Sequence, residues 1–403
     1  MKNTSFVLKG NIIYNDTRKS FRVVEKGYLV CVDGISKGVY ETLPEEYSSL
    51  PQRDYGERLI VPGLVDLHFH APQFAFRGTG MDLELMEWLD ENAFPEETRF
   101  QDTSYAEKAY GIVAEIYRKG ATTRGVCFAS RHTDSTLVLM EKMEEAGLVT
   151  YGGKVNMNRL APEALVEKST EESVSETLRW LEAAKGRFQH TKPIITPRFT
   201  PSCTDDLMEK LGEIRKEYDL PSQPHLPESF GEIETVKKLV PSAPFYGEAY
   251  NMFGLFGGDH KCIMAHCVHC SDPEIALMKK NHVFVAHCPE CNANISSGIS
   301  PVRKYLEAGL DVGLGSDVAG GTTESIFASM IEAIRVSKLY WRIVDSGKAP
   351  LTFPEAFYLA TQGGGKFFGK VGSFEDGYEL DAIVLDDKNL PYPRELTPLQ
   401  RLE

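Results

Sequence analysis

The middle of the chain alternates between short apolar segments and longer stretches with a helical pattern. The apolar segments number eight and lie at 59–70, 122–129, 151–158, 193–199, 222–226, 262–267, 283–289 and 312–317. The stretches between them repeat apolar residues at helical spacing, as in 101–119, 134–147, 170–187, 204–218, 231–239 and 272–280. Strand and helix in repeated alternation predict an α/β fold with a closed (β/α)8 barrel of the TIM type. An open, doubly wound sheet is the alternative that the same pattern allows.

The two ends of the chain have a different pattern. Residues 1–58 contain short strand-like pieces separated by polar turns, and residues 370–387 contain strand-like pieces again. We therefore predict a barrel over residues 59–369. Residues 1–58 and 370–403 together are predicted to build one small β-sandwich domain.

The longest insertion follows the first predicted strand and covers residues 78–100. We expect it to be loop-like. Loops that follow barrel strands lie on the catalytic face, so this insertion could cover a bound ligand.

Composition and charge limit the classes of partner. The chain has 403 residues, of which 42% are hydrophobic and 25% are charged, as in ordinary globular proteins. Its formal net charge of -14 repels phosphate backbones and anionic lipids, so we expect no nucleic-acid and no membrane partner. The first residues lack the apolar core of a signal peptide, which predicts a cytoplasmic location.

Histidines and an aspartate lie at the ends of four predicted strands. The first strand ends in His68 and His70, and side chains two residues apart on a strand point the same way. His225 ends the fifth strand, His266 lies in the sixth and Asp317 ends the eighth. Imidazoles with one carboxylate suit Zn²⁺ and leave room for water, so these strand ends predict a metal site.

Less specific explanations exist for each of these residues. A single histidine is usually an ordinary core or surface residue, and a carboxylate after a strand is often only a helix N-cap. The coincidence at four strand ends favours the metal site. Glu228 lies three residues after His225. There it can take a proton from a water molecule at the metal and deliver that proton to a ring nitrogen of a substrate.

Several motifs resemble those of the guanine deaminases in the amidohydrolase superfamily. In chain order they are PGLVDLHFHAPQ, PRFTPSC, HLPES, MAHC, AHCPECNANISSG, GLGSDVAGG and GSFEDGYELDAIVLD. The resemblance extends from about residue 20 to residue 390. The H-x-H, H-x-x-E and aspartate elements are typical of the superfamily. HAPQ, the Trp88 segment with FPEETRF, PRF and SDVAGG are typical of guanine deaminases.

The resemblance implies hydrolysis of guanine to xanthine and ammonia, with one Zn²⁺ per chain, in a homodimer. It implies five metal ligands: His68, His70, His225, His266 and Asp317. Glu228 is then the proton shuttle, Asp317 also orients the nucleophilic water, and His266 contacts that water more than the metal.

Four further residues are implied to bind the purine. Gln73 of HAPQ and Arg198 of PRF can match the polar edges of guanine, while Phe199 and Trp88 supply apolar faces. The alternative for Arg198 is a surface ion pair. The alternative for Trp88 is core packing in a lid helix.

The sequence also departs from the family pattern in places. Pro227 precedes Glu228 and removes one backbone donor beside the expected proton shuttle. Cys291 stands where a serine is usual. These changes leave the implied metal ligands intact.

Four cysteines offer a rival metal site. Cys267, Cys270, Cys288 and Cys291 have the C-x2-C spacing of a structural zinc ribbon. The alternative is that they are buried or loop thiols, which the reducing cytosol keeps free. Two rival functions also stay open at this point: an amidohydrolase acting on cytosine, adenosine or a triazine, and a barrel that has lost catalysis and serves as a scaffold.

Overall fold

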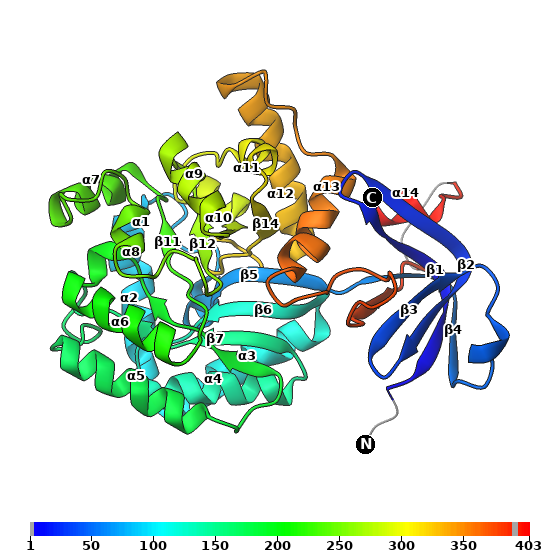
Figure 1. Cartoon of the computed structure of the whole chain (residues 1–403), viewed down its shortest axis with the longest axis horizontal. Helices are drawn as coiled ribbons and strands as arrows, with labels where there is room; N and C mark the ends of the chain where they lie inside the picture. The colour runs from blue at the N-terminus through cyan, green and yellow to red at the C-terminus, as the bar shows by residue number, and fades with distance from the viewer. Residues whose placement is uncertain (1–3, 389–393) are drawn as a thin grey trace. The chain divides into compact units, whose positions relative to one another are not determined.

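The computed structural model describes residues 4–388 and 394–403, and the chain forms two compact units (Figure 1). One unit contains Met1–Val65 and Leu351–Glu403, and the other contains Asp66–Pro350. The domain boundaries after residues 58 and 369 stay predictions. The parts of the predicted terminal segments at 1–3 and 389–393 lie outside the described residues.

The second unit is built on parallel strands that follow one another in chain order. Its first sheet pairs β5 (Leu64–His70), β6 (Thr122–Phe128), β7 (Val149–Gly153) and β9 (Thr191–Pro193). Beyond these, β8 (Val155–Asn156) pairs with β10 (Thr196–Pro197). The second sheet contains β11 (His225–Leu226), β12 (Ile263–His266), β13 (Phe284–His287) and β14 (Asp311–Leu314).

Backbone bridges join the two sheets into a closed barrel. Ser222 bridges Ile195 on one side and Cys262 on the other, which connects the first sheet to the second. At the opposite seam, the Asp317 N–H donates to the carbonyl of His68 over 2.9 Å. The last strand therefore returns to the first, as the TIM-type prediction requires.

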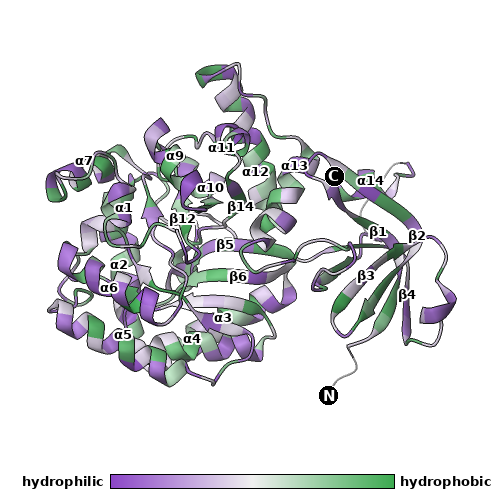
Figure 2. Ribbon diagram, in the orientation of Figure 1, coloured by the Kyte–Doolittle hydropathy of each residue, from purple (hydrophilic) through white to green (hydrophobic). Residues whose placement is uncertain are grey.

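Helices separate the strands along the chain. The six predicted helices correspond to α3 (Thr103–Lys119), α4 (Thr133–Glu145), α5 (Thr170–Ala184), α6 (Asp205–Glu217), α7 (Phe230–Leu239) and α9 (Asp272–Lys280). The chain adds α8 (Glu248–Asn251), α10 (Pro289–Asn294), α11 (Val302–Ala308), α12 (Ile326–Leu339) and η6 (Tyr340–Val344). Hydrophilic and hydrophobic residues alternate along α3 to α6 in Figure 2, as expected for helices with one buried face. No helix among the described residues is long and apolar enough to cross a membrane.

The apolar run at 59–70 contains two strands rather than one. Its first part belongs to β4 (Gln52–Pro62), which lies in the sheet of the first unit, and its second part is β5. The Gly63 N–H between them donates to the carbonyl of Asp381. Apolar content alone cannot show this change of sheet, because both strands are buried here.

The first unit contains one five-stranded sheet in the described residues. Its order is β15 (Ala382–Leu385), β4, β1 (Phe6–Thr17), β2 (Ser20–Val32) and β3 (Ile35–Tyr40). The predicted β-sandwich is thus a single sheet here. The short helices of this unit are η1 (Glu45–Tyr47), α13 (Phe353–Tyr358), η7 (Leu359–Gly363) and α14 (Pro398–Leu402). Phe353 and Phe357 of α13 pack against Phe21 of β2 at ring distances of 5.2 and 5.4 Å, so a helix contacts the sheet at this point.

The insertion after β5 is helical, so the expected loop is wrong. It consists of η2 (Ala71–Phe76), α1 (Leu85–Trp88), η3 (Leu89–Ala93), α2 (Phe94–Thr98) and η4 (Arg99–Gln101). Leu85, Trp88, Phe94 and Phe100 are buried in one apolar cluster. Helices this short show no clear periodicity, which is why the sequence pattern did not reveal them.

Candidate metal centre and substrate pocket

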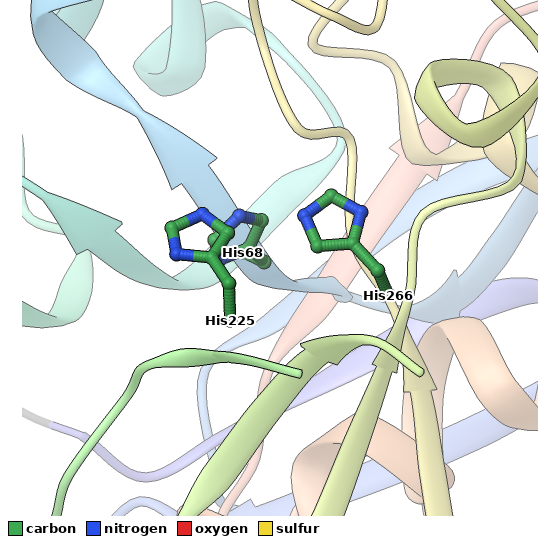
Figure 3. A group of neighbouring side chains, drawn as sticks. All are labelled: His68, His225 and His266. Carbon is green, nitrogen blue, oxygen red and sulfur yellow. The ribbon is translucent and has the colours of Figure 1, made fainter. Parts of the chain in front are cut away.

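Four imidazoles converge at the carboxyl ends of the barrel strands. His68 and His70 end β5, His225 begins β11 and His266 ends β12, and each side chain is buried. Figure 3 shows the rings of His68, His225 and His266 close to one another, and one nitrogen from each lies within 4.8 Å of the others. The structure therefore brings together imidazoles from three different strands.

Asp317 completes the predicted ligand set. One of its carboxylate oxygens, Oδ1, lies 3.2 Å from His68 Nε2 and 3.7 Å from His70 Nε2. The other, Oδ2, lies 3.7 Å from His266 Nε2. The five side chains predicted to bind metal consequently form overlapping groups of possible ligands, which share His68, His266 and Asp317.

The local backbone is adapted to this convergence. A Cβ added at Gly315 would meet His68 Cβ at 3.0 Å, so a glycine lets the end of β14 approach β5. His266 and Asp317 have φ values of 68° and 47°, a left-handed conformation that is unfavourable for residues other than glycine. Such strain is frequent at functional sites, where the surrounding structure holds it.

Hydrogen bonds fix which nitrogen faces the centre in two of the rings. The Nδ1–H of His225 donates to the carbonyl of Arg198 over 2.6 Å, so the lone pair of this ring is on Nε2, which lies 3.1 Å from His70 Nε2. His266 Nδ1 likewise contacts Asn292 Oδ1 at 2.9 Å. In the described part of the chain, the buried Nε2 atoms of His68 and His266 have no hydrogen-bond partner. Buried nitrogens without a donor, next to a carboxylate, fit a divalent metal ion.

The electrostatics agree with that donor set. Burial lowers the pKa of His70 and His225 well below the usual range, and His68 lowers both further. Burial disfavours the charged form of Asp317, but His68 and His266 outweigh it and hold its pKa well below the usual range. Neutral imidazoles and an ionised carboxylate are the forms that bind metal.

Glu228 lies beside this cluster, at the place predicted for a proton shuttle. Its Oε1 atom is 3.4 Å from His266 Nδ1, and the Ser297 hydroxyl donates to the same oxygen over 3.5 Å. Burial raises the pKa of Glu228 well above the usual range, and Asp317 and Glu232 raise it further. A carboxyl group with a raised pKa can both accept and hold a proton near neutral pH.

The predicted substrate-binding residues open onto the same space. Gln73, Trp88, Arg198 and Phe199 line one pocket together with Glu228. Four of the five residues predicted to bind metal line it as well, namely His70, His225, His266 and Asp317. The predicted purine-binding residues and most of the predicted metal ligands therefore face the same space.

For Arg198 and Trp88, the structure decides between the alternatives that the sequence left open. Arg198 is only 3% exposed and forms a buried ion pair with Glu97, so a surface ion pair is wrong. Trp88 donates its Nε1–H to the carbonyl of Thr79 and packs in the apolar cluster of the insertion. Trp88 therefore combines core packing with a position in the pocket wall.

Two buried carboxylates near the site, Asp66 and Glu97, were not among the residues predicted from the sequence. Asp66 accepts hydrogen bonds from the Ser316 N–H at 3.0 Å and from the Tyr117 hydroxyl at 2.9 Å, which ties β5 to the end of β14. Burial raises the pKa of Asp66 to about 6. An acidic residue inside the apolar run LVDLHFH was a signal that could have identified it. Glu97 lies in an acidic pair, Glu96 and Glu97, whose burial no local pattern indicates.

The cysteines do not form the rival ribbon site. Among the described residues, no group of possible metal ligands contains four cysteines. Cys291 instead groups with Glu228, His266 and Asp317. All eight cysteines are free and buried, as the thiol alternative expects.

A cluster of histidines and an aspartate at the carboxyl ends of barrel strands is typical of metal-dependent hydrolases. This site belongs to that class. Residues 59–402 match the amidohydrolase family, to which the chain belongs. The guanine deaminase of Dictyostelium discoideum is 40% identical over 346 residues, which are 84% of this chain and 76% of that protein. The guanine deaminase of Escherichia coli K12 is 33% identical over 395 residues, 95% of this chain and 84% of that protein.

A solved structure is similar over almost the whole chain. The crystal structure of the guanine deaminase from C. acetobutylicum, with guanine bound in its active site, superimposes with a TM-score of 0.95 at 44% identity. The match covers 99% of this chain and 94% of that one. The predicted resemblance to guanine deaminases and the predicted barrel fold are thereby confirmed.

Proposed function

We propose that this chain is a hydrolase that converts guanine and water to xanthine and ammonia. The main support is that four of the five residues expected to bind metal line one pocket with the residues expected to bind purine, in a chain similar to guanine deaminases over most of its length. Residues of this pocket are proposed to bind the metal, transfer the proton and hold the purine.

The proposed cofactor is one Zn²⁺ per chain. His68, His70, His225, His266 and Asp317 would hold it, as the unpartnered nitrogens and the adjacent carboxylate favour. Bound there, the metal would supply Lewis-acid chemistry that makes hydroxide available at neutral pH. Elemental analysis of the purified protein tests both the identity and the number of the metal.

Glu228 and Asp317 carry out the proton chemistry in this proposal. Glu228 takes a proton from the attacking water and gives it to N3 of guanine, while Asp317 orients the water through its carboxylate. The water oxygen bonds to C2, the second proton of the water passes to the amino group, and the C2–N bond breaks, so that ammonia leaves and C2 becomes a carbonyl carbon. His266, which contacts both carboxylates, keeps the water and Glu228 in line.

Gln73, Arg198, Phe199 and Trp88 are proposed to hold the purine. The amide and the guanidinium match its carbonyl and ring nitrogens, and the two aromatic side chains cover its faces. Their burial excludes bulk water from the reacting carbon, which strengthens each polar contact.

A substrate panel tests the proposal against related activities. Guanine, cytosine, adenosine and an aminotriazine are each incubated with the metal-loaded protein, and ammonia and the deaminated product are measured. We expect turnover of guanine above that of the other compounds. Preference for another compound would assign the chain to a different amidohydrolase, and no turnover of any would favour the scaffold alternative.

We also propose a homodimer and a cytoplasmic location. At the end of α12 and in η6, Leu339, Ile343 and Val344 are 49%, 74% and 60% exposed, which is unusual for such large apolar side chains. Light scattering on the wild type and on Ile343→Glu tests whether this surface supports a dimer.

For the proposed cytoplasmic location, the eight unlinked cysteines are compatible with a reducing compartment. Cell fractionation tests this location. The absence of nucleic-acid and membrane partners stays a prediction.

A further inference from the structure

Glu97 connects the helical insertion to the purine-binding residues. It lies on α2, is 4% exposed, and accepts two short hydrogen bonds. Its Oε1 accepts from the Gln73 amide nitrogen over 2.7 Å, and its Oε2 accepts from Arg198 Nη1 over 2.6 Å. Glu97 itself does not line the pocket, so any effect on a ligand passes through these two residues.

The contact with Glu97 determines how the Gln73 amide is oriented. An ionised carboxylate can only accept hydrogen bonds, so the amide nitrogen of Gln73 must face it. The amide oxygen therefore points away, where it accepts from the Ala319 N–H over 3.4 Å. The pattern of donors and acceptors that Gln73 presents to a ligand follows from Glu97.

Glu97 also balances the charge of Arg198. The guanidinium is buried and lies 5.1 Å from the ring of Phe94, so bulk water does little to screen it. With Glu97 ionised, the pair has no net charge. At this end of the pocket a balanced guanidinium favours a neutral ligand, whereas an uncompensated guanidinium would favour an anionic one.

We propose that Glu97 is a positioning and specificity-determining residue. It holds Gln73 and Arg198 in the arrangement that binds the purine, and it makes the pocket select neutral purine bases over anionic ones. The inference rests on the proposed function and adds to it the charge class of the substrate. A purely structural ion pair between the insertion and the barrel is the competing explanation.

The decisive variant is Glu97→Gln, which keeps the shape of the side chain and removes its charge. Its amide cannot accept from both Gln73 and Arg198 without turning a donor toward one of them. We expect the KM for guanine to rise about tenfold, with a smaller change in kcat, because Gln73 and Arg198 lose the orientation that binds the purine, a loss comparable to one hydrogen bond to a charged group. Urate, a purine that is a monoanion at neutral pH, should inhibit the variant several-fold more strongly than the wild type.

Opposite changes for a neutral and an anionic purine separate the two explanations. If urate binding weakens in parallel with guanine binding, or if the KM for guanine does not change, the proposal is overturned. Glu91→Gln is the matched control, because Glu91 lies in the same insertion but is exposed. This control removes the same charge from the protein and should leave both constants unchanged.

Two additions keep the test decisive. Glu97→Asp keeps the charge but shortens the reach, so it should raise the KM for guanine while urate inhibition stays at the wild-type level. A wild-type KM in this variant would contradict the positioning role even if Glu97→Gln does not fold. Guanine turnover by the wild type tests the proposed function separately. Should turnover be absent, calorimetric binding of guanine and urate to the wild type and Glu97→Gln still tests the opposite shifts.

Discussion

Replacing Glu228 by glutamine separates proton transfer from folding and metal binding. The amide has nearly the shape of the carboxylate. The neighbours of Oε1 are all weak partners: His266 Nδ1 at 3.4 Å, the Ser297 hydroxyl at 3.5 Å and the Cys291 thiol at 4.0 Å. The Glu228 backbone N–H still donates to Glu232 over 2.8 Å, so the loop keeps its anchor. We therefore expect the melting temperature and the metal content of Glu228→Gln to stay close to those of the wild type.

The catalytic loss should be large. General acid–base catalysis by one group contributes about 10²- to 10⁴-fold in rate, and a group that both accepts and donates the proton belongs at the upper end. We expect kcat for guanine to fall by about 10³- to 10⁴-fold. The KM should change far less, because the shuttle acts mainly in the transition state.

The assay measures metal content, thermal melting and guanine turnover on the same preparation. Glu234→Gln is the control, because Glu234 is an exposed residue of α7 that pairs with Lys237. A Glu228→Gln variant that retains more than about a tenth of wild-type turnover would refute the proton-shuttle role. Asp317 would then be the next candidate base.

Three further substitutions test other parts of the site and the fold. His68→Ala should lose most of the bound metal, because removing one ligand opens the site. Emission spectroscopy measures the metal content. Full metal content in His68→Ala, together with metal loss in Cys267→Ser, would assign the metal to the cysteines. Arg198→Ala should lower kcat/KM for guanine by the equivalent of about 2–4 kcal/mol. Its melting temperature should also fall, because Glu97 is left buried without its ion-pair partner. An unchanged kcat/KM in a folded variant would exclude contact between Arg198 and the substrate. Burial raises the pKa of Glu274 from 4.5 to about 7, so the wild type should lose about 3 kcal/mol of unfolding free energy as pH rises through that window. Glu274→Gln should show a flatter pH dependence in denaturant titrations, and identical slopes would contradict this.

The barrel could be predicted because its local signals agree with its topology. Parallel strands are buried on both faces and appear as apolar runs, while surface helices keep a helical spacing of apolar residues. The metal ligands could be predicted for a related reason. Side chains at the carboxyl ends of successive barrel strands meet at one face, so His225 and Asp317 could be assigned to one site although 92 positions separate them.

Other features depend on long-range packing that no local pattern carries. Glu96 and Glu97 are adjacent acidic residues, yet only Glu97 is buried, because the turn of α2 directs it toward Gln73 and Arg198. The change of sheet at Gly63 is equally hidden, because it interrupts an apolar run without altering its composition. The sequence contains these residues but not the contacts that give them a role.

Pro227 departs from the family pattern, and neighbouring hydrogen bonds compensate for the backbone N–H that it lacks. Without an N–H, Pro227 cannot donate, but its carbonyl accepts from the N–H groups of both Val268 and His269, at 3.0 and 3.2 Å. The loop before Glu228 is thus fixed to the end of β12 through an acceptor instead of a donor. Glu228 is held separately by its own N–H, which Glu232 accepts, and the Tyr246 hydroxyl donates to Glu232 over 2.6 Å. Because both the carbonyl and the N–H of the Pro227–Glu228 peptide are held, the missing donor of the proline does not displace the Glu228 carboxylate from the histidine cluster.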